Sequence, residues 1–213
     1  ILHIYGNIHN QKTDGFAVYP RHLVVADEYA VADITETHIA INNIAFHVNG
    51  STDFSLGKHT ALTYTRSQWS GDEATVIYDN NATLHSGSSF KTLNMTIGGK
   101  ITRNESSYWL ADENTDVQVD GIYLGKNKHH IDNASFIHHK AGVSKSRQLY
   151  KGILAESSRS VFSGRLLIDE DAQKSDAGQL NQTMLLGDKA EIDTKPQLEV
   201  YADDVKAAHG ASV

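Results

Sequence analysis

The stretch Asp116-Val-Gln-Val-Asp-Gly-Ile-Tyr-Leu124 places apolar side chains at alternate positions, which is the pattern of a β-strand with one buried face. Similar short stretches, rich in β-branched and aromatic residues, recur at residues 22–26, 61–65, 160–168 and 197–202. No segment sustains the i, i+3, i+4 spacing of a helix over three turns. The sequence therefore predicts an all-β fold.

Turn-forming residues separate these stretches, and three of them predict turns: Asn49-Gly50, Asp79-Asn80-Asn81 and Gly98-Gly99. The chain has 213 residues and only two prolines, and no Ser/Gly-rich linker or charge block interrupts it. We therefore expect one continuous domain over residues 1–213. A β-sandwich or jelly roll and a β-solenoid both agree with this pattern.

Weak self-similarity favours the solenoid. Ala40, Ala61 and Ala82 recur at intervals of 21 residues, as do Ala134 and Ala155. This spacing predicts about ten coils of roughly 20 residues each. The open ends of such a solenoid expose strand edges that need a cap. Because no cap is visible before the last residue, we expect a capping segment beyond it.

Composition excludes several classes of function. The chain has 19 Lys and Arg against 26 Asp and Glu, a formal charge of −7, and no dense run of cations, which argues against a nucleic-acid groove. No run of 18 apolar residues occurs, so no membrane-spanning helix is predicted. The absence of cysteine excludes disulfides and thiolate sites supplied by this chain and suits a reducing compartment. Six Asn-x-Ser/Thr sequons occur without a visible signal peptide, so we interpret them as chance matches.

The densest group of titratable side chains lies in residues 129–139, which contain His129, His130, Asp132, His138 and His139. Imidazole and carboxylate groups are able to hold a divalent metal. Neighbouring residues of a strand face opposite sides, so at most one histidine of each pair can join a common site. His130 and His139 are therefore weak metal candidates, and structural or surface histidines are the favoured interpretation.

Other catalytic patterns are absent. No Gly-x-Ser-x-Gly nucleophile elbow occurs. Gly98-Gly99-Lys100 and the segment from Gly121 to Lys126 lack the Gly-Lys-Ser/Thr ending of a phosphate loop, and we interpret both as β-turns. Asp169-Glu170-Asp171 is interpreted as a solvated turn rather than a pair of glycosidase carboxylates.

The C-terminal third is the most distinctive part of the sequence. Its longest motif is Lys195-Pro-Gln-Leu-Glu-Val-Tyr-Ala-Asp-Asp-Val-Lys206, followed by His209-Gly-Ala211. Together with the segments from 144 to 194, this string resembles the core of the SufB/SufD family of iron-sulfur cluster assembly proteins. A looser resemblance extends upstream to about residue 16.

The resemblance implies a right-handed parallel β-helix and a non-enzymatic scaffold role in iron-sulfur cluster biogenesis. It further implies pairing with a SufB-like subunit through the C-terminal end of the β-helix, and binding of a SufC-like ATPase through a later helical segment that these 213 residues do not include. An iron-sulfur cluster would bind transiently at the subunit interface, and a reduced flavin accompanies some such complexes. The implied location is the cytoplasm, or the plastid stroma in a eukaryote, and a homodimer is expected without the SufB-like partner.

His209 is the residue that the resemblance singles out, because it occupies the family's His-Gly-Ala position near the subunit interface. A neutral imidazole can ligate iron or relay protons. The family usually has cysteine two residues earlier, where this chain has Ala207, so thiol chemistry is expected from the partner. Asp203, Asp204 and Lys206 are expected at the interface, without a chemical role.

Two alternatives remain open from the sequence. One is a metal-dependent β-helix or cupin-like enzyme that uses the histidines of residues 129–139. The other is a secreted carbohydrate-binding solenoid.

Overall fold

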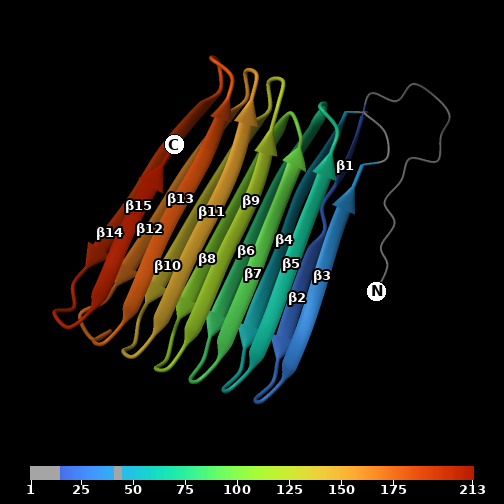
Figure 1. The fold of residues 1–213 in the computed structure, drawn as a ribbon. Helices are drawn as coiled ribbons and strands as arrows, with labels where there is room; N and C mark the ends of the chain where they lie inside the picture. Colours follow the sequence, from blue (N-terminus) through green and yellow to red (C-terminus); the bar gives the residue numbers. More distant parts are fainter. Residues whose placement is uncertain (1–14, 41–44) are drawn as a thin grey trace.

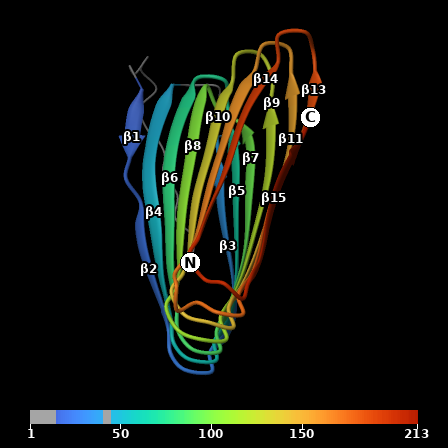
Figure 2. The same cartoon turned by 90° about the vertical axis from the view of Figure 1, so that its left-hand side faces the viewer.

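The computed structural model describes residues 15–40 and 45–213, which form two facing sheets of parallel strands (Figures 1 and 2). Sheet A contains β1 (Phe16–Val18), β2 (Arg21–Ala26), β4 (Phe46–Leu56), β6 (Ala74–Leu84), β8 (Ile101–Leu110), β10 (His130–His139), β12 (Arg159–Ile168) and β14 (Glu191–Val200). Sheet B contains β3 (Val31–Ile39), β5 (Ala61–Ser70), β7 (Ser89–Gly98), β9 (Asp116–Gly125), β11 (Lys145–Ala155), β13 (Asp176–Leu186) and β15 (Lys206–Ser212). From β2 onward successive strands alternate between the sheets, so each coil adds one strand to each. The fold is the predicted β-solenoid.

The predicted coil length is wrong. Residues paired across neighbouring strands of sheet B, such as Phe90 with Val117 and Val117 with Ser146, are 27 and 29 residues apart in the sequence. The seven strands of sheet B therefore correspond to seven long coils, not ten short ones. The alanine spacing misled because Ala61 begins a strand of sheet B whereas Ala82 lies inside sheet A, so these residues are not equivalent.

Two of the three predicted turns are also wrong. Asn49-Gly50 lies inside β4, and Asp79-Asn80-Asn81 lies inside β6, whereas Gly98-Gly99 does end β7. Likewise, Gly121 to Gly125 belongs to β9 rather than to a turn. Asn49 and Asn81 lie at outer positions of these strands, whereas Asn80 lies between the sheets, where the space is partly polar. Buried Asn80, Asn104 and Asn133 all lie there.

Alternation divides each strand into an inner and an outer set of side chains. In β6 every second residue from Ala74 to Leu84 is buried, and β10 follows the same pattern. The largest apolar cluster contains an aromatic column in which Phe54 lies 4.8 Å from Tyr64 and 5.0 Å from Phe90, measured between ring centroids. Burial of these rings supplies much of the driving force for stacking the coils.

Glycine on the inner face makes room for tyrosine on the neighbouring strand. The ring of Tyr123 in β9 crosses Gly152 in β11, where a Cβ would lie 2.1 Å from the ring. The Tyr123 hydroxyl thereby reaches β13, two strands away, where it donates to Asn181 Oδ1 at 3.1 Å and lies 2.6 Å from Thr183 Oγ1. In the same way, the ring of Tyr150 in β11 crosses Gly121 in β9.

Within residues 15–40 and 45–213 no helix is present, and hence none that could cross a bilayer. Three of the six sequon asparagines, Asn104, Asn133 and Asn181, are buried between the sheets. Their burial agrees with the interpretation of the sequons as chance matches, because a glycan requires an exposed side chain.

Candidate subunit interface at the C-terminal end

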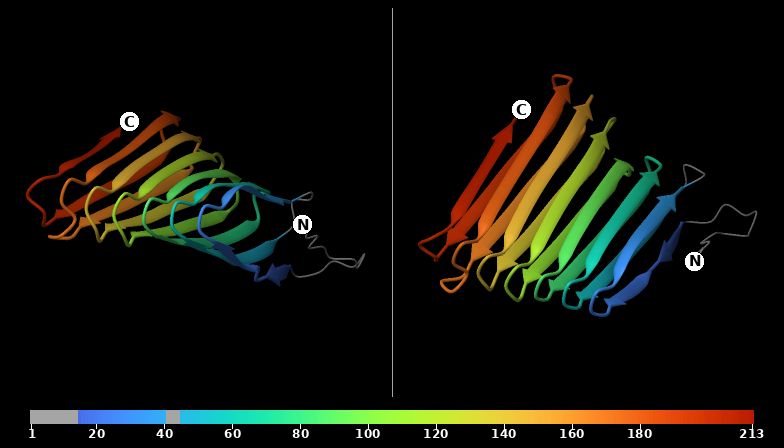
Figure 3. Two further views of the ribbon diagram at one scale, coloured as in Figure 1. Left: turned by 90° about the horizontal axis from the view of Figure 1, so that it is seen from below. Right: turned by 60° about the horizontal axis from the view of Figure 1, so that its bottom comes forward.

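The two last strands of the described chain lie at the same end of the solenoid, one in each sheet (Figure 3). β14 pairs only with β12, and β15 only with β13. Both sheets therefore end in an open edge at this end. An open edge presents unpaired backbone groups that another strand can bind.

The hydrogen-bond pattern identifies which backbone groups are open. Lys206 N donates to Ser175 O of the preceding coil at 2.9 Å. Because alternate residues of a parallel strand bond to opposite sides, the N–H groups of Ala207, His209 and Ala211 point away from β13. On β14, Pro196 stands at a position whose N–H would face the open side, so a proline costs no ladder bond there.

His209 is the last member of an inner column of side chains. It pairs in register with Gln179, which pairs with Gln148. Gln179 Nε2 donates to Gln148 Oε1 at 2.8 Å, and Gln148 Nε2 donates to Ser135 Oγ at 2.5 Å. No coil follows β15 among the described residues, so the imidazole of His209 is exposed.

Ala207 lies on the same face as His209, since both pair with inner residues of β13. A thiol at position 207 would stand beside the imidazole. The methyl group that is present there can neither bind iron nor accept sulfur.

Asp203 and Asp204 lie in the exposed turn between β14 and β15. The backbone of Asp204 binds the turn of the preceding coil, since its N donates to Gln173 Oε1 at 2.9 Å and its O accepts from Lys174 N at 2.6 Å. The two carboxylates therefore lie on the C-terminal rim of the solenoid.

Lys206 completes an in-register row of alternating charge on the outer face of sheet B, which runs Asp116, Lys145, Asp176, Lys206. A hydrogen bond from Arg147 lowers the pKa of Asp176, and the charge of Lys206 adds to this effect. The last residue of this row is therefore a cation, Lys206, on the edge strand β15.

The structure does not bring the candidate metal ligands together. His130 and His139 begin and end β10 and face opposite sides of sheet A. His139 is buried and contacts Ser144 Oγ at 2.6 Å and Ser146 Oγ at 2.8 Å. His129, just before β10, contacts Asp72 at 2.8 Å, and His138, near the end of β10, contacts Asp169 at 2.9 Å. Among the described residues no group of three or more His, Cys, Asp or Glu is placed to hold a metal ion.

A buried charged network near the first coils was not predicted. Arg66 on β5 is completely buried, and its Nη2 donates to Asn94 Oδ1 at 3.0 Å and to Asn104 Oδ1. Its Nε and Nη1 have no partner, and no carboxylate of the described residues forms an ion pair with it. Burial lowers the pKa of Arg66. The sequence signal was present, since Arg66 takes the inner position between buried Tyr64 and buried Gln68.

Glu36 on β3 is the carboxylate of this network. Its carboxylate accepts hydrogen bonds from Tyr64 at 2.6 Å and from Tyr78 at 2.5 Å, and it contacts His38 at 2.5 Å. Burial raises the pKa of Glu36, but the hydrogen bonds from His38, Tyr64 and Tyr78 outweigh it and lower that pKa to about 2. The network therefore holds a carboxylate anion at the N-terminal coils, at the opposite end of the solenoid from His209.

Comparison with known proteins places this geometry in a family. The family model described as "SUF system FeS cluster assembly, SufBD core domain" matches residues 8–213. The chain belongs to the SufBD core family. The resemblance drawn from the C-terminal motif is thereby confirmed, and the match includes every strand of the solenoid.

Individual members of the SufBD core family are more distant. The chain is 28% identical over 213 residues to the iron-sulfur cluster assembly protein SufD of Escherichia coli, covering 100% of this chain and 50% of that protein. It is 28% identical to a SufBD family protein of Synechocystis, covering 92% and 45%, and 28% identical to the chloroplastic protein ABCI7 of Arabidopsis thaliana, covering 91% and 41%. The chain spans about half the length of these curated relatives.

Proposed function

We propose that this chain is the solenoid core of a SufD-like subunit that acts in iron-sulfur cluster assembly as a scaffold rather than as an enzyme. Membership of the SufBD core family and the SufD-named relatives support the assembly role. The single observation that carries the proposal is the match of the SufBD core family model to residues 8–213, which covers every strand of the solenoid.

The partner at this end is a SufB-like subunit. A related solenoid has the same strand spacing, so its last strands can extend sheet A at β14 and sheet B at β15. Asp203, Asp204 and Lys206 line the rim of this contact. A SufC-like ATPase acts on the assembled pair and provides the energy for rearrangement.

The cluster is the cargo of this interface and forms transiently there. His209 contributes a neutral imidazole nitrogen to iron, and the thiol ligands come from the partner, since this chain has no cysteine. The reduced flavin that accompanies some family complexes stays a prediction, and the proposal includes no step through it. The cytoplasm or the plastid stroma, both reducing, is the matching compartment.

Anaerobic co-expression with SufB-like and SufC-like proteins tests the proposal. Purification through a tag on this chain should recover all three proteins with iron, and iron should be lost when the SufB-like protein is omitted. His209→Ala should lower the iron content without lowering the amount of partner recovered. The matched control is His59→Ala, an exposed histidine in a turn near the first coils.

Two results would contradict the proposal. One is iron content in His209→Ala equal to that of wild type and of His59→Ala, which removes the ligand role. The other is a chain that binds neither partner but carries stoichiometric metal alone, which would favour the metal-dependent enzyme.

A further inference from the structure

A column of polar side chains runs between the sheets and ends at β15. In register it contains Gln148 on β11, Gln179 on β13 and His209 on β15. Both glutamines are buried, at 4% exposed each. Each amide nitrogen donates to a residue earlier in the chain, Gln148 Nε2 to Ser135 Oγ and Gln179 Nε2 to Gln148 Oε1. One acceptor is therefore left over at the C-terminal end of the column.

That acceptor is Gln179 Oε1. The atom is buried, and none of the described residues donates a hydrogen bond to it. A buried amide oxygen without a donor is destabilising, and such atoms are rare in native proteins. We therefore expect a donor on the coil that follows Gln179.

The last coil contains few side chains that could be this donor. Its inner positions are given by the register with β12 and β13, and they are occupied by Ile192, Thr194, Pro196, Leu198, Val200, Ala207, His209 and Ala211. Only Thr194 and His209 in this set have polar side chains, and Thr194 Oγ1 already accepts from Asn181 Nδ2 at 3.2 Å. His209 is the only inner side chain of this coil with an N–H group.

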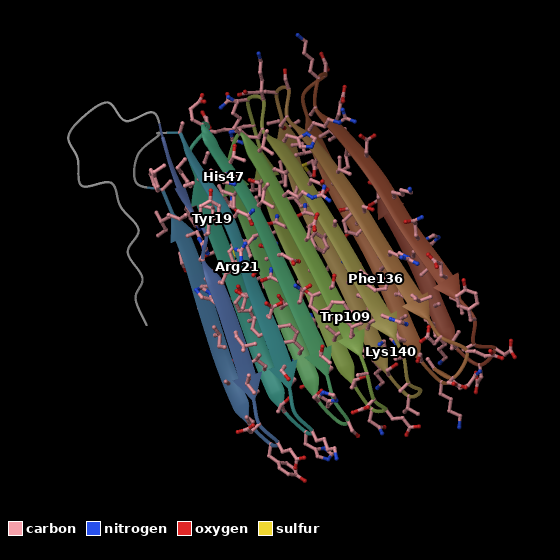
Figure 4. All side chains as sticks on the ribbon, turned by 180° about the vertical axis from the view of Figure 1, so that it is seen from behind. Tyr19, Arg21, His47, Trp109, Phe136 and Lys140 are labelled. Carbon is pink, nitrogen blue, oxygen red and sulfur yellow. The ribbon has the colours of Figure 1, made fainter. Side chains whose placement is uncertain are left out.

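Sheet A, whose outer face Figure 4 shows, lies on the other side of the column. The amide of Gln179 lies against Gly164 of β12, where a Cβ would collide with Nε2. Pro196 of β14 pairs with Gly164 and has no N–H group. Neither residue carries a side-chain donor, so β15 is the remaining source of one among the neighbouring strands.

His209 has the reach that this hydrogen bond requires. The Nε2 atom of an imidazole is as many bonds from the backbone as the amide nitrogen of a glutamine. Strands of one sheet are about 4.8 Å apart, so register neighbours are equally spaced along the column. The bond of 2.8 Å between Gln179 Nε2 and Gln148 Oε1 can therefore be repeated one strand later, between His209 Nε2 and Gln179 Oε1. The exposed imidazole reaches this position by rotation about its side-chain bonds.

We propose that Gln179 is a positioning residue for His209, whose Nε2–H it accepts, so that the lone pair of the neutral ring is on Nδ1. This inference rests on the proposed function, because it concerns the imidazole that is proposed to bind iron. The two ring nitrogens point apart, so Nδ1 faces away from β13. A histidine that binds a metal usually donates its other N–H to a carbonyl or carboxylate, which fixes the ring and makes the ligand more basic. Gln179 supplies that carbonyl.

The direction of the column selects the tautomer. Because both amides donate toward earlier residues, the group presented to His209 is an oxygen and not an NH2 group. An NH2 group at this place would donate to the ring and occupy the lone pair that iron needs. The hydrogen bonds of Gln148 and Gln179 thus bear on the chemistry of His209 although neither glutamine contacts iron.

Heteronuclear NMR of the full-length protein with isotope-labelled histidine tests this hydrogen bond without iron. At neutral pH the bound Nε2–H should give a resolved resonance, because the hydrogen bond slows its exchange with water, and His209→Ala should remove it. Gln179→Met keeps the length of the side chain without the amide and should also remove the resonance. The matched control is Gln68→Met near the first coils, which removes another buried amide oxygen without a partner among the described residues and should leave the resonance unchanged.

Iron binding by the assembled complex tests the consequence. Competition with a chelator under anaerobic conditions should show an affinity for ferrous iron about tenfold weaker in Gln179→Met than in wild type. Gln68→Met should match wild type, and all variants should recover the same amount of the SufB-like partner. Circular dichroism checks folding, and Gln179→Leu is the second variant if Gln179→Met does not fold.

The proposal is overturned if wild type shows no protected N–H of His209, or if Gln179→Met leaves that resonance unchanged. It is overturned equally if Gln179→Met and Gln68→Met hold iron alike while His209→Ala loses it. Iron retained by His209→Ala contradicts the ligand role in the proposed function instead. In that case the resonance still decides whether Gln179 holds the ring.

Discussion

The guanidinium of Arg66 lies 4.3 Å from the ring centroid of Tyr78, and the hydroxyl of that tyrosine donates to Glu36 at 2.5 Å. A buried cation and a carboxylate are thus connected through one phenol rather than through a direct ion pair. Burial raises the pKa of Tyr78 and the bond to Glu36 adds to this, so the phenol stays protonated and donates. Tyr64 donates to the same carboxylate from β5, the strand next to that of Glu36.

Two substitutions of Arg66 should distinguish how much stability its buried charge contributes from how much its packing contributes. Arg66→Ala leaves the network without its cation and removes the donor to Asn94 and Asn104, so we expect the free energy of unfolding to fall by about 3–5 kcal/mol. Arg66→Met keeps most of the volume and should cost less. Urea unfolding measures both. The control is Arg165→Met, which changes an exposed arginine over an aromatic ring. We expect a far smaller loss of stability there. Equal losses at the two sites would contradict the role of burial.

Glu36→Gln should change the acid stability of the chain. The pKa of Glu36 is about 2 when folded against an ordinary value of 4.5. The carboxylate therefore contributes its full stability above pH 4.5 and loses it as the pH falls toward 2, a difference of about 3 kcal/mol. Glu36→Gln should be less stable than wild type at neutral pH and should lose less stability over this interval. Thermal melts between pH 5 and pH 2 measure the two slopes, and parallel slopes would show that Glu36 does not titrate in this way.

His139 should produce a pH dependence in a different interval. Burial lowers its pKa from 6.5 to about 4, with a smaller effect from the charge of His138. The folded chain therefore binds fewer protons than the unfolded chain, and stability falls by about 3 kcal/mol as the pH drops from 6.5 to 4. In His139→Gln the amide can keep a hydrogen bond to Ser144 or Ser146, and this part of the dependence should disappear. Urea unfolding at pH 7, 5.5 and 4 measures it, and an unchanged dependence in the variant would exclude His139 as its source.

Gly152→Ala should destabilise the solenoid although the residue added is small. A Cβ at this position would lie 2.1 Å from the Tyr123 ring, so the ring must move and its hydroxyl must leave Asn181 and Thr183. We expect a loss of about 1–3 kcal/mol. Gly178→Ala is the matched control, because its nearest neighbour is the flexible Arg147 side chain at 3.3 Å. A melting temperature equally lowered in both variants would refute the steric explanation.

The strands of this chain follow from its sequence pattern more closely than its turns do. Alternation predicted the strands at residues 116–124 and 160–168, which correspond to β9 and β12, because a strand with one buried face requires it. Turn chemistry failed at Asn49-Gly50, where Gly50 lies inside β4 under the ring of Tyr78. A glycine that ends a strand and a glycine that makes room for an aromatic ring look the same in a sequence.

The candidate interface was predicted only through its motif. The segment ending at His209 resembled the SufB/SufD family, and the family match confirms that resemblance. His209, Asp203, Asp204 and Lys206 do lie at one end of the solenoid, but their interface role stays a prediction. The network of Arg66 and Glu36 was missed because these residues are 30 positions apart in the sequence and meet only in the register of β3 with β5, while Tyr78 joins them from the facing sheet.

The sequence by itself determined that the chain is all-β, that it lacks thiol chemistry of its own, and that it belongs with the SufB/SufD proteins. These properties follow from local alternation, composition and one long motif. The tertiary structure decided the register of the coils, and with it which side chains share a row. Parallel neighbours in a solenoid are about 29 residues apart, so no local pattern fixes their pairing. The buried network of Glu36, Arg66 and Tyr78 exists only once that register is set.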